Sequence, residues 1–132
     1  MHVLRRSREA LVPHGIVLDL QVIRPDPRVE LEGSLFCEAD GAPLFETADA
    51  ARAAVDLFIA KGLLDEEAVD DHDVVQHYAT GAALVDDWEP KKRKLPDEAV
   101  PTLCAYPGAC LVRERCRLRR LRRLDPHEGH ER

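Results

Sequence analysis

The chain has 132 residues, of which 45% are hydrophobic and 33% are charged, and its formal net charge is -6. This length allows one small domain with a single core. No stretch approaches the roughly 20 apolar residues that span a bilayer, and no apolar leader with a cleavage site follows the first arginines. We therefore expect a cytoplasmic protein that does not enter a membrane.

The N-terminal part predicts a helix, a tight turn and a buried strand. Residues 3–11 carry apolar side chains at spacings that suit one side of a helix, which Pro13 ends before a turn at Gly15. Residues 16–23 form a nearly continuous apolar run, which is typical of a strand covered on both faces. Two prolines within residues 24–27 then interrupt the strand.

The middle of the chain contains a second strand and a long helix. Residues 29–37 alternate apolar and polar side chains, which predicts one half-exposed antiparallel strand at a sheet edge. Asp40 and Gly41 predict a turn, and a short hairpin strand is one continuation. Thr47 is a favourable N-cap for a helix that runs to about Lys61.

The last third contains short elements and one longer strand. We predict a strand over residues 73–78, a helix after Thr80, an exposed linker over residues 90–96 and a helix over residues 97–104. The final strand runs from about residue 109 to residue 118. One of its faces carries Cys110, Val112, Cys116 and Leu118, and the other carries Arg113, Arg115, Arg117 and Arg119. Residues 125–132 are predicted to be a disordered polar tail.

The first helix, the turn Leu11-Val12-Pro13-His14-Gly15 and the following strand resemble the late αβ unit of class I S-adenosylmethionine-dependent methyltransferases. Further likeness comes from Val22-Ile23-Arg24-Pro25, residues 48–64, His77-Tyr78 and Val112-Arg113-Glu114-Arg115. The resemblance covers roughly residues 4–124 and implies a Rossmann-like methyltransferase remnant. We accordingly expect an α/β or α+β fold in one domain over residues 1–124. Its sheet would be small and mixed, with three to five strands and helices mainly on one face.

The resemblance implies no cofactor site within this chain. In the family, an earlier half of the domain holds S-adenosylmethionine on a glycine-rich turn, where glycine lets the backbone approach the cofactor closely. No two of the seven glycines are separated by a single residue, so the sequence has no G-x-G turn. We assign no catalytic and no cofactor-binding residue. S-adenosylmethionine is expected to bind only if a partner chain supplies the missing half.

Without that half, the strand at residues 16–22 lacks a neighbour. An unpaired apolar strand is prone to aggregation, so we expect residues 29–37 to fold back onto it. We also expect a homodimer, or another protein partner, to cover the remaining apolar face. The predicted interface residues are Ile16, Leu18, Leu20 and Trp88, the last because tryptophan is enriched at interface hot spots.

Charges are segregated along the chain: acids dominate residues 29–89, whereas arginines dominate residues 111–124. The arginine face of the last strand has two interpretations. It is a surface for an anion or an acidic partner, or it pairs internally, with Glu30 and Glu32 across from Arg115 and Arg117. We favour internal pairing, because the pI of about 5.5 and the scarcity of aromatic residues disfavour nucleic-acid binding.

Asp73 and His77 are weak candidates for metal ligands, because they belong to a cluster of acidic and histidine residues. They would share a face on a helix, and they would also share a face on a strand. A solvated acidic loop explains the same residues. The four cysteines match no common zinc spacing and are expected to be thiols that pack as small apolar residues.

Three functional hypotheses follow. The first is a non-catalytic methyltransferase-like domain that acts through homodimerisation or partner binding. The second is a methyltransferase subunit that needs a separate cofactor-binding chain. The third and weakest is binding of nucleic acid or an acidic protein through the arginine-rich last strand. Catalysis by this chain alone is not expected, because the sequence has no glycine-rich cofactor turn.

Overall fold

The computed structural model describes residues 2–89, 91 and 94–125, which form four helices and five strands. Their order is α1 (His2–Ala10), β1 (Ile16–Val22), β2 (Arg28–Leu31), β3 (Ser34–Glu38), α2 (Ala42–Ala60), β4 (Leu64–Tyr78), α3 (Gly81–Trp88), α4 (Ala99–Ala105) and β5 (Cys110–Arg123). Residues 126–132 of the predicted tail and residues 90, 92 and 93 of the predicted linker lie outside the described part. Among the described helices, none is long and apolar enough to cross a membrane.

The five strands form an antiparallel sheet in which β5 pairs with three other strands. The strand order is β1-β5-β2-β3, and β4 also pairs with β5. β2 is antiparallel to both β3 and β5, with Val29 opposite Val112. The predicted combination of helices with three to five strands is therefore confirmed. The sheet is antiparallel, however, where we expected a mixed one.

The chain divides into two compact units, each built from separate segments. Unit 1 comprises residues 1–21, 47–71 and 117–132, and unit 2 comprises residues 22–46 and 72–116. Helix α2 and strands β4 and β5 each contribute residues to both units. The single domain expected over residues 1–124 stays a prediction.

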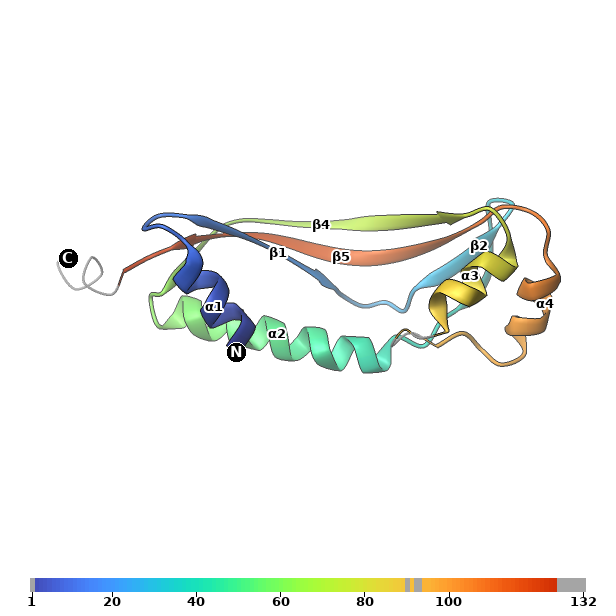
Figure 1. Ribbon diagram of the computed structural model, residues 1–132, viewed down its shortest axis with the longest axis horizontal. Helices are drawn as coiled ribbons and strands as arrows, with labels where there is room; N and C mark the ends of the chain where they lie inside the picture. Colours follow the sequence, from blue (N-terminus) through green and yellow to red (C-terminus); the bar gives the residue numbers. More distant parts are fainter. Residues whose placement is uncertain (1, 90, 92–93, 126–132) are drawn as a thin grey trace. The chain divides into compact units, whose positions relative to one another are not determined.

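In unit 1, helices cover one face of the strands. Figure 1 shows α1 and α2 on the same side of β1, β4 and β5. Val55 and Phe58 of α2 are buried with Leu64 of β4 and Leu121 of β5, and Val17 of β1 packs against this cluster. The apolar residues of α2 recur at helical spacing, so one stripe of the helix can face the strands.

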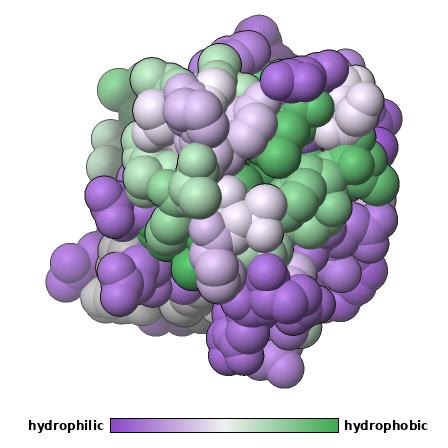
Figure 2. Space-filling model, turned by 90° about the vertical axis from the view of Figure 1, so that its right-hand side faces the viewer, coloured by the Kyte–Doolittle hydropathy of each residue, from purple (hydrophilic) through white to green (hydrophobic). Residues whose placement is uncertain are grey.

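Unit 2 has a core of its own beneath two short helices. Trp88 of α3 and Leu103 of α4 are buried with Val29 and Val112 of the sheet. The two helices pack closely at Gly81, where a Cβ atom would lie 2.0 Å from the carbonyl oxygen of Leu103. Figure 2 shows the side of unit 2 on which α4 lies, where apolar surface is bordered by hydrophilic side chains.

The segment predicted as one strand over residues 29–37 is a hairpin. Glu32 and Gly33 separate β2 from β3 with φ angles of 51° and 78°. Positive φ at both central residues is typical of the two-residue turns that match the twist of paired strands. Because β2 pairs with β5, the expectation that this segment folds back onto β1 is wrong.

Helix α2 begins at Ala42, five residues before the predicted N-cap at Thr47. The Asp-Gly signal starts the helix instead of a hairpin. The Asp40 carboxylate accepts a hydrogen bond from the Ala42 N–H at 3.0 Å, and the Gly41 carbonyl accepts one from the Phe45 N–H at 2.9 Å. Both contacts satisfy backbone groups at the helix start, where donors otherwise lack partners.

Strands β4 and β5 are longer than predicted. β4 has 15 residues, whereas we predicted a strand only over residues 73–78. Most of its side chains are exposed, so its first half lacks the apolar alternation by which a strand is identified. β5 continues to Arg123, beyond the predicted end at residue 118. The charged residues along β4 and β5 define the candidate site.

Candidate functional site

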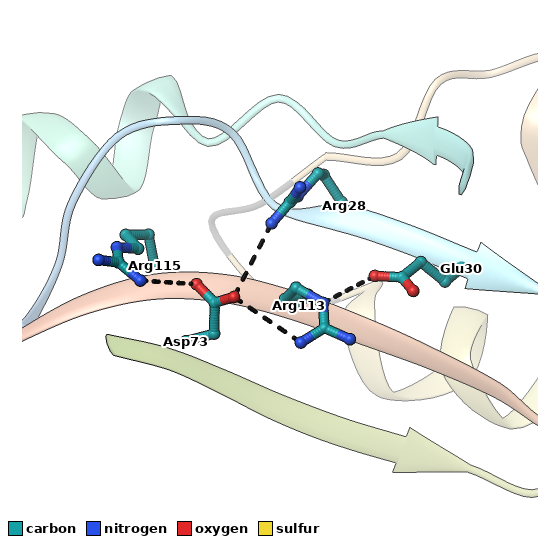
Figure 3. A network of polar contacts seen from close by, with 5 residues as sticks. All are labelled: Arg28, Glu30, Asp73, Arg113 and Arg115. Carbon is teal, nitrogen blue, oxygen red and sulfur yellow. Dashed lines mark hydrogen bonds and ion pairs between the residues drawn. The ribbon is translucent and has the colours of Figure 1, made fainter. Parts of the chain in front are cut away.

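Asp73 of β4 is the centre of an ion-pair network in unit 2 (Figure 3). Its Oδ1 lies 3.2 Å from Nη1 of Arg115, and its Oδ2 lies 3.7 Å from Nη1 of Arg113 and 4.0 Å from Nη2 of Arg28. Arg113 also donates from Nε to Oε2 of Glu30 at 2.8 Å. This hydrogen bond, together with the nearby charge of Asp73, raises the pKa of the Arg113 guanidinium.

In unit 1, carboxylates of β4 pair with arginines of β5 in the same way. Arg117 donates from Nε and Nη2 to the two oxygens of Asp71, at 2.8 and 3.0 Å. Glu67 accepts a hydrogen bond from Arg120 at 3.0 Å and two from Arg122 at 2.6 and 3.2 Å. The bonds from Arg122 and then from Arg120 lower the pKa of Glu67. Two-pronged arginine–carboxylate pairs add geometric specificity to their charge attraction.

Arg119 does not share the exposed face of β5 on which we predicted it. Alternate residues of the strand are buried up to Cys116, and the next buried residue is Arg119, so the two-residue period slips by one position. The Arg119 side chain is 8% exposed and bonds to Glu66 at 2.6 Å and to Asp56 of α2 at 2.9 Å. The prediction that Arg119 belongs to an exposed arginine surface is therefore wrong.

The arginine face is occupied by carboxylates of the chain itself. Arg113, Arg115 and Arg117 all have such partners, as the internal-pairing interpretation predicts. The partners differ from those expected: most come from β4, and Glu30 pairs with Arg113 instead of Arg115. Exposed pairs of this kind contribute little to stability. The ion pairs between β4 and β5, which form a ladder along the two strands, therefore serve mainly to fix the pairing of β4 with β5 within each unit.

Asp73 and His77 both lie on β4, as candidate ligands on a strand would, but Asp73 faces arginines. The described residues contain no group of three or more His, Cys, Asp or Glu side chains arranged to hold a metal ion. The four cysteines form no disulfide. Burial raises the pKa of the Cys110 thiol, and burial with the nearby charge of Glu98 raises that of Cys37. These shifts disfavour the reactive thiolate at both positions.

Trp88 lies in the core of unit 2 and not at the surface where we expected an interface residue. Its side chain is 2% exposed, and its indole N–H donates to the Tyr78 hydroxyl at 3.1 Å. That hydroxyl donates in turn to the Asp87 carboxylate at 2.5 Å. The tryptophan is therefore held in place by both packing and hydrogen bonding.

The edges of the sheet differ in how well they are protected against further pairing. Strands β1, β3 and β4 each pair with a single neighbour among the described strands. β4 carries a row of carboxylates and β3 has only five residues, both of which discourage an added strand. β1 has neither protection: the side chains of Leu18 and Leu20 are 65% and 53% exposed, while Ile16 is partly buried.

Asp19, the one charged residue of β1, was not among the functional residues predicted from the sequence. In unit 1 it lines a cavity of about 230 Å³ with residues of α1 and α2. An available signal was a lone carboxylate within an otherwise almost wholly apolar strand. Such a residue is costly to bury without partners, so it identifies a position that needs an explanation.

Comparison with known proteins gives no identification, since no family model, no curated protein and no solved structure matches this chain. The features of the molecule that bear on its function are the edge of β1, the ion pairs between β4 and β5, and the cavity beside Asp19.

Proposed function

We propose that this protein is a non-catalytic binding module that pairs with a second copy of itself through the edge of β1. The main support is the exposure of Leu18 and Leu20 on a strand that pairs only with β5 within the described sheet. The side chain of Val17, which directly precedes Leu18, packs against the core of unit 1. The two leucines therefore belong to the opposite, uncovered face.

Pairing of two β1 strands would remove both causes of instability at this edge. The backbone groups along the edge would gain hydrogen-bond partners, and each leucine would be partly covered by side chains of the paired strand. Full burial of a leucine is worth about 1.5–3 kcal/mol, so this partial cover is worth less. A two-fold arrangement is the simplest that satisfies both β1 edges at once, because it uses the same surface on each copy and leaves neither β1 strand open.

The methyltransferase-like remnant remains our proposal for the ancestry of the fold. In unit 1, β5 pairs with both β1 and β4, and the chain passes from β1 to β4 through β2, β3 and α2. Apart from the inserted β2 and β3, two strands joined through a helix with a third strand between them resemble a split β–α–β unit of the kind found in α/β folds. This arrangement supports the proposal, whereas the antiparallel sheet as a whole does not favour it.

The second hypothesis uses the same edge for a different partner. A separately encoded cofactor-binding chain would add its strands to β1 and form a methyltransferase together with this protein. Titration of S-adenosylmethionine into the purified protein discriminates between the two. Absence of heat from a folded dimer is expected for the non-catalytic module. Binding with a micromolar dissociation constant would instead require a cofactor site in this chain.

Light scattering after size-exclusion chromatography tests the pairing. The wild-type protein should have twice the chain mass of 14.8 kDa, and the double variant Leu18→Lys/Leu20→Lys should have the mass of one chain. Leu35→Lys is the matched control, since Leu35 is 59% exposed on the edge strand β3. A wild-type monomer, or a double variant that stays dimeric, would overturn the proposal.

A further inference from the structure

The cavity beside Asp19 combines apolar walls with a few polar groups. It lies between α1, β1 and α2 of unit 1 and has a volume of about 230 Å³. Val3, Leu4, Val17, Ala54 and Val55 supply most of the apolar wall. The polar lining consists of Ser7, Asp19 and Gln21. Apolar pockets with a few converging polar groups are the usual form of small-molecule sites.

The two oxygens of the Asp19 carboxylate have different surroundings. Oδ1 accepts a hydrogen bond from Nε2 of Gln21 at 3.0 Å. Oδ2 is shielded from solvent and accepts no hydrogen bond in the described structure. A buried polar atom without a partner costs free energy, and native proteins have few of them. Oδ2 therefore needs a hydrogen-bond donor that the described residues do not supply.

Neighbouring side chains direct their donors elsewhere. The Ser7 hydroxyl donates to the Val3 carbonyl at 2.9 Å. Arg8, on the same helix, donates to the carbonyls of Leu63 and Leu124. The donor that Oδ2 needs is thus not supplied by these residues, and a bound molecule can supply it from the cavity.

We propose that this cavity binds a small aliphatic ammonium ion. Its N–H group donates to Asp19 Oδ2, where its charge offsets that of the carboxylate, and its hydrocarbon chain lies against the apolar wall. The volume is below the range of about 300–1,000 Å³ typical of sites for drug-sized ligands, so the chain is short. This site does not depend on the pairing of β1 with a second copy.

Isothermal titration with n-pentylamine at neutral pH tests the site, with 1-pentanol as the uncharged probe of equal chain length. We expect the amine to bind at least tenfold more tightly than the alcohol. Asp19→Asn should abolish this preference, whereas Asp65→Asn, the same charge change on β4, should retain it. Equal binding of amine and alcohol, no binding of the amine, or an unchanged preference in Asp19→Asn would overturn the proposal.

Two further measurements keep the test independent of folding. Asp19→Asn keeps the oxygen that Gln21 contacts and removes the unsatisfied charge, so its thermal midpoint without amine should be no lower than that of the wild type. A lower midpoint would mean that Oδ2 already has a partner in the free protein and would contradict the proposal. Ala51→Leu, on the α2 side of the cavity, should block the amine by filling space, and undiminished binding to this variant would also contradict it.

Discussion

Arg119 of β5 and Asp56 of α2 are joined by a hydrogen bond of 2.9 Å between Nη2 and Oδ1, which connects strand and helix within unit 1. The guanidinium also contacts Glu66, and its stem is buried with the core. Although burial by itself lowers the pKa of an arginine, the hydrogen bonds from Arg119 to Asp56 and Glu66 outweigh it and raise the pKa. Arg119 thus combines burial in unit 1 with hydrogen bonds to two carboxylates.

Replacing this side chain should lower stability more than replacing its exposed neighbour. Arg119→Ala removes the buried stem and leaves two carboxylates without their donor, so we expect a loss of about 2 kcal/mol in the free energy of unfolding. Arg120→Ala, at a side chain that is 49% exposed, should stay within about 0.5 kcal/mol. Urea unfolding measures both. Equal effects would show that the burial of Arg119 has no energetic importance.

The Glu67 pairs should make stability depend on pH in a defined window. Hydrogen bonds from Arg122 and Arg120 lower its pKa from the ordinary value of 4.5, so the folded state binds its proton less readily than the unfolded state. The stabilisation is therefore complete above the unfolded pKa and is lost as the pH falls through the folded pKa. The difference in unfolding free energy between wild type and Glu67→Gln, measured in urea, should be largest at pH 7 and should shrink as the pH falls below 4.5. A constant difference over this range would refute the assignment.

The hydroxyl of Tyr78 should stabilise unit 2 through Trp88. Tyr78→Phe removes the acceptor of the indole N–H and the donor to Asp87, so we expect a loss of about 1–3 kcal/mol. The fluorescence of Trp88, the chain's single tryptophan, should follow the same unfolding transition. Gln76→Ala is the control, because Gln76 only approaches Asp87 at 3.5 Å from an exposed position. A stability equal to wild type in Tyr78→Phe would contradict a structural role of this network.

Two glycines should respond to alanine for different reasons. At Gly81 an added Cβ would lie 2.0 Å from the carbonyl oxygen of Leu103, so α3 and α4 must move apart, at a cost of about 3 kcal/mol. At Gly62 there is open space, but the φ angle is +73°, so alanine costs about 1 kcal/mol from backbone strain. The midpoint of thermal unfolding should be lower for Gly81→Ala than for Gly62→Ala. The reverse order would argue against the close helix packing.

Local signals in the sequence were sufficient for several elements. The Pro13–Gly15 turn placed α1 and β1 within one residue of their observed bounds. Thr80 was expected to cap a helix, and its hydroxyl accepts a hydrogen bond from the Ala83 N–H at 3.1 Å. Both features depend on residues a few positions apart, which a single sequence displays.

Elements that depend on distant partners were not predictable in the same way. The first half of β4 looks like an acidic loop, because its carboxylates are satisfied by arginines about 50 residues later, as in the pair of Glu67 and Arg122. The slip in β5 that buries Arg119 falls where the alternation of arginines breaks, at Arg119-Arg120, and the sequence alone does not decide which of these two side chains is buried. The open Oδ2 of Asp19 depends on how α1, β1 and α2 come together, which only the fold reveals.

The central claim, that β1 pairs with a second copy, is tested most directly by hydrogen–deuterium exchange of β1 at increasing protein concentration. Backbone amides of an edge strand exchange more slowly once they donate to a partner. We expect exchange within Ile16–Val22 to slow as the protein concentration rises, with no change in the edge strand Ser34–Glu38. Exchange of β1 that is independent of concentration, or slowing confined to β3, would contradict the claim.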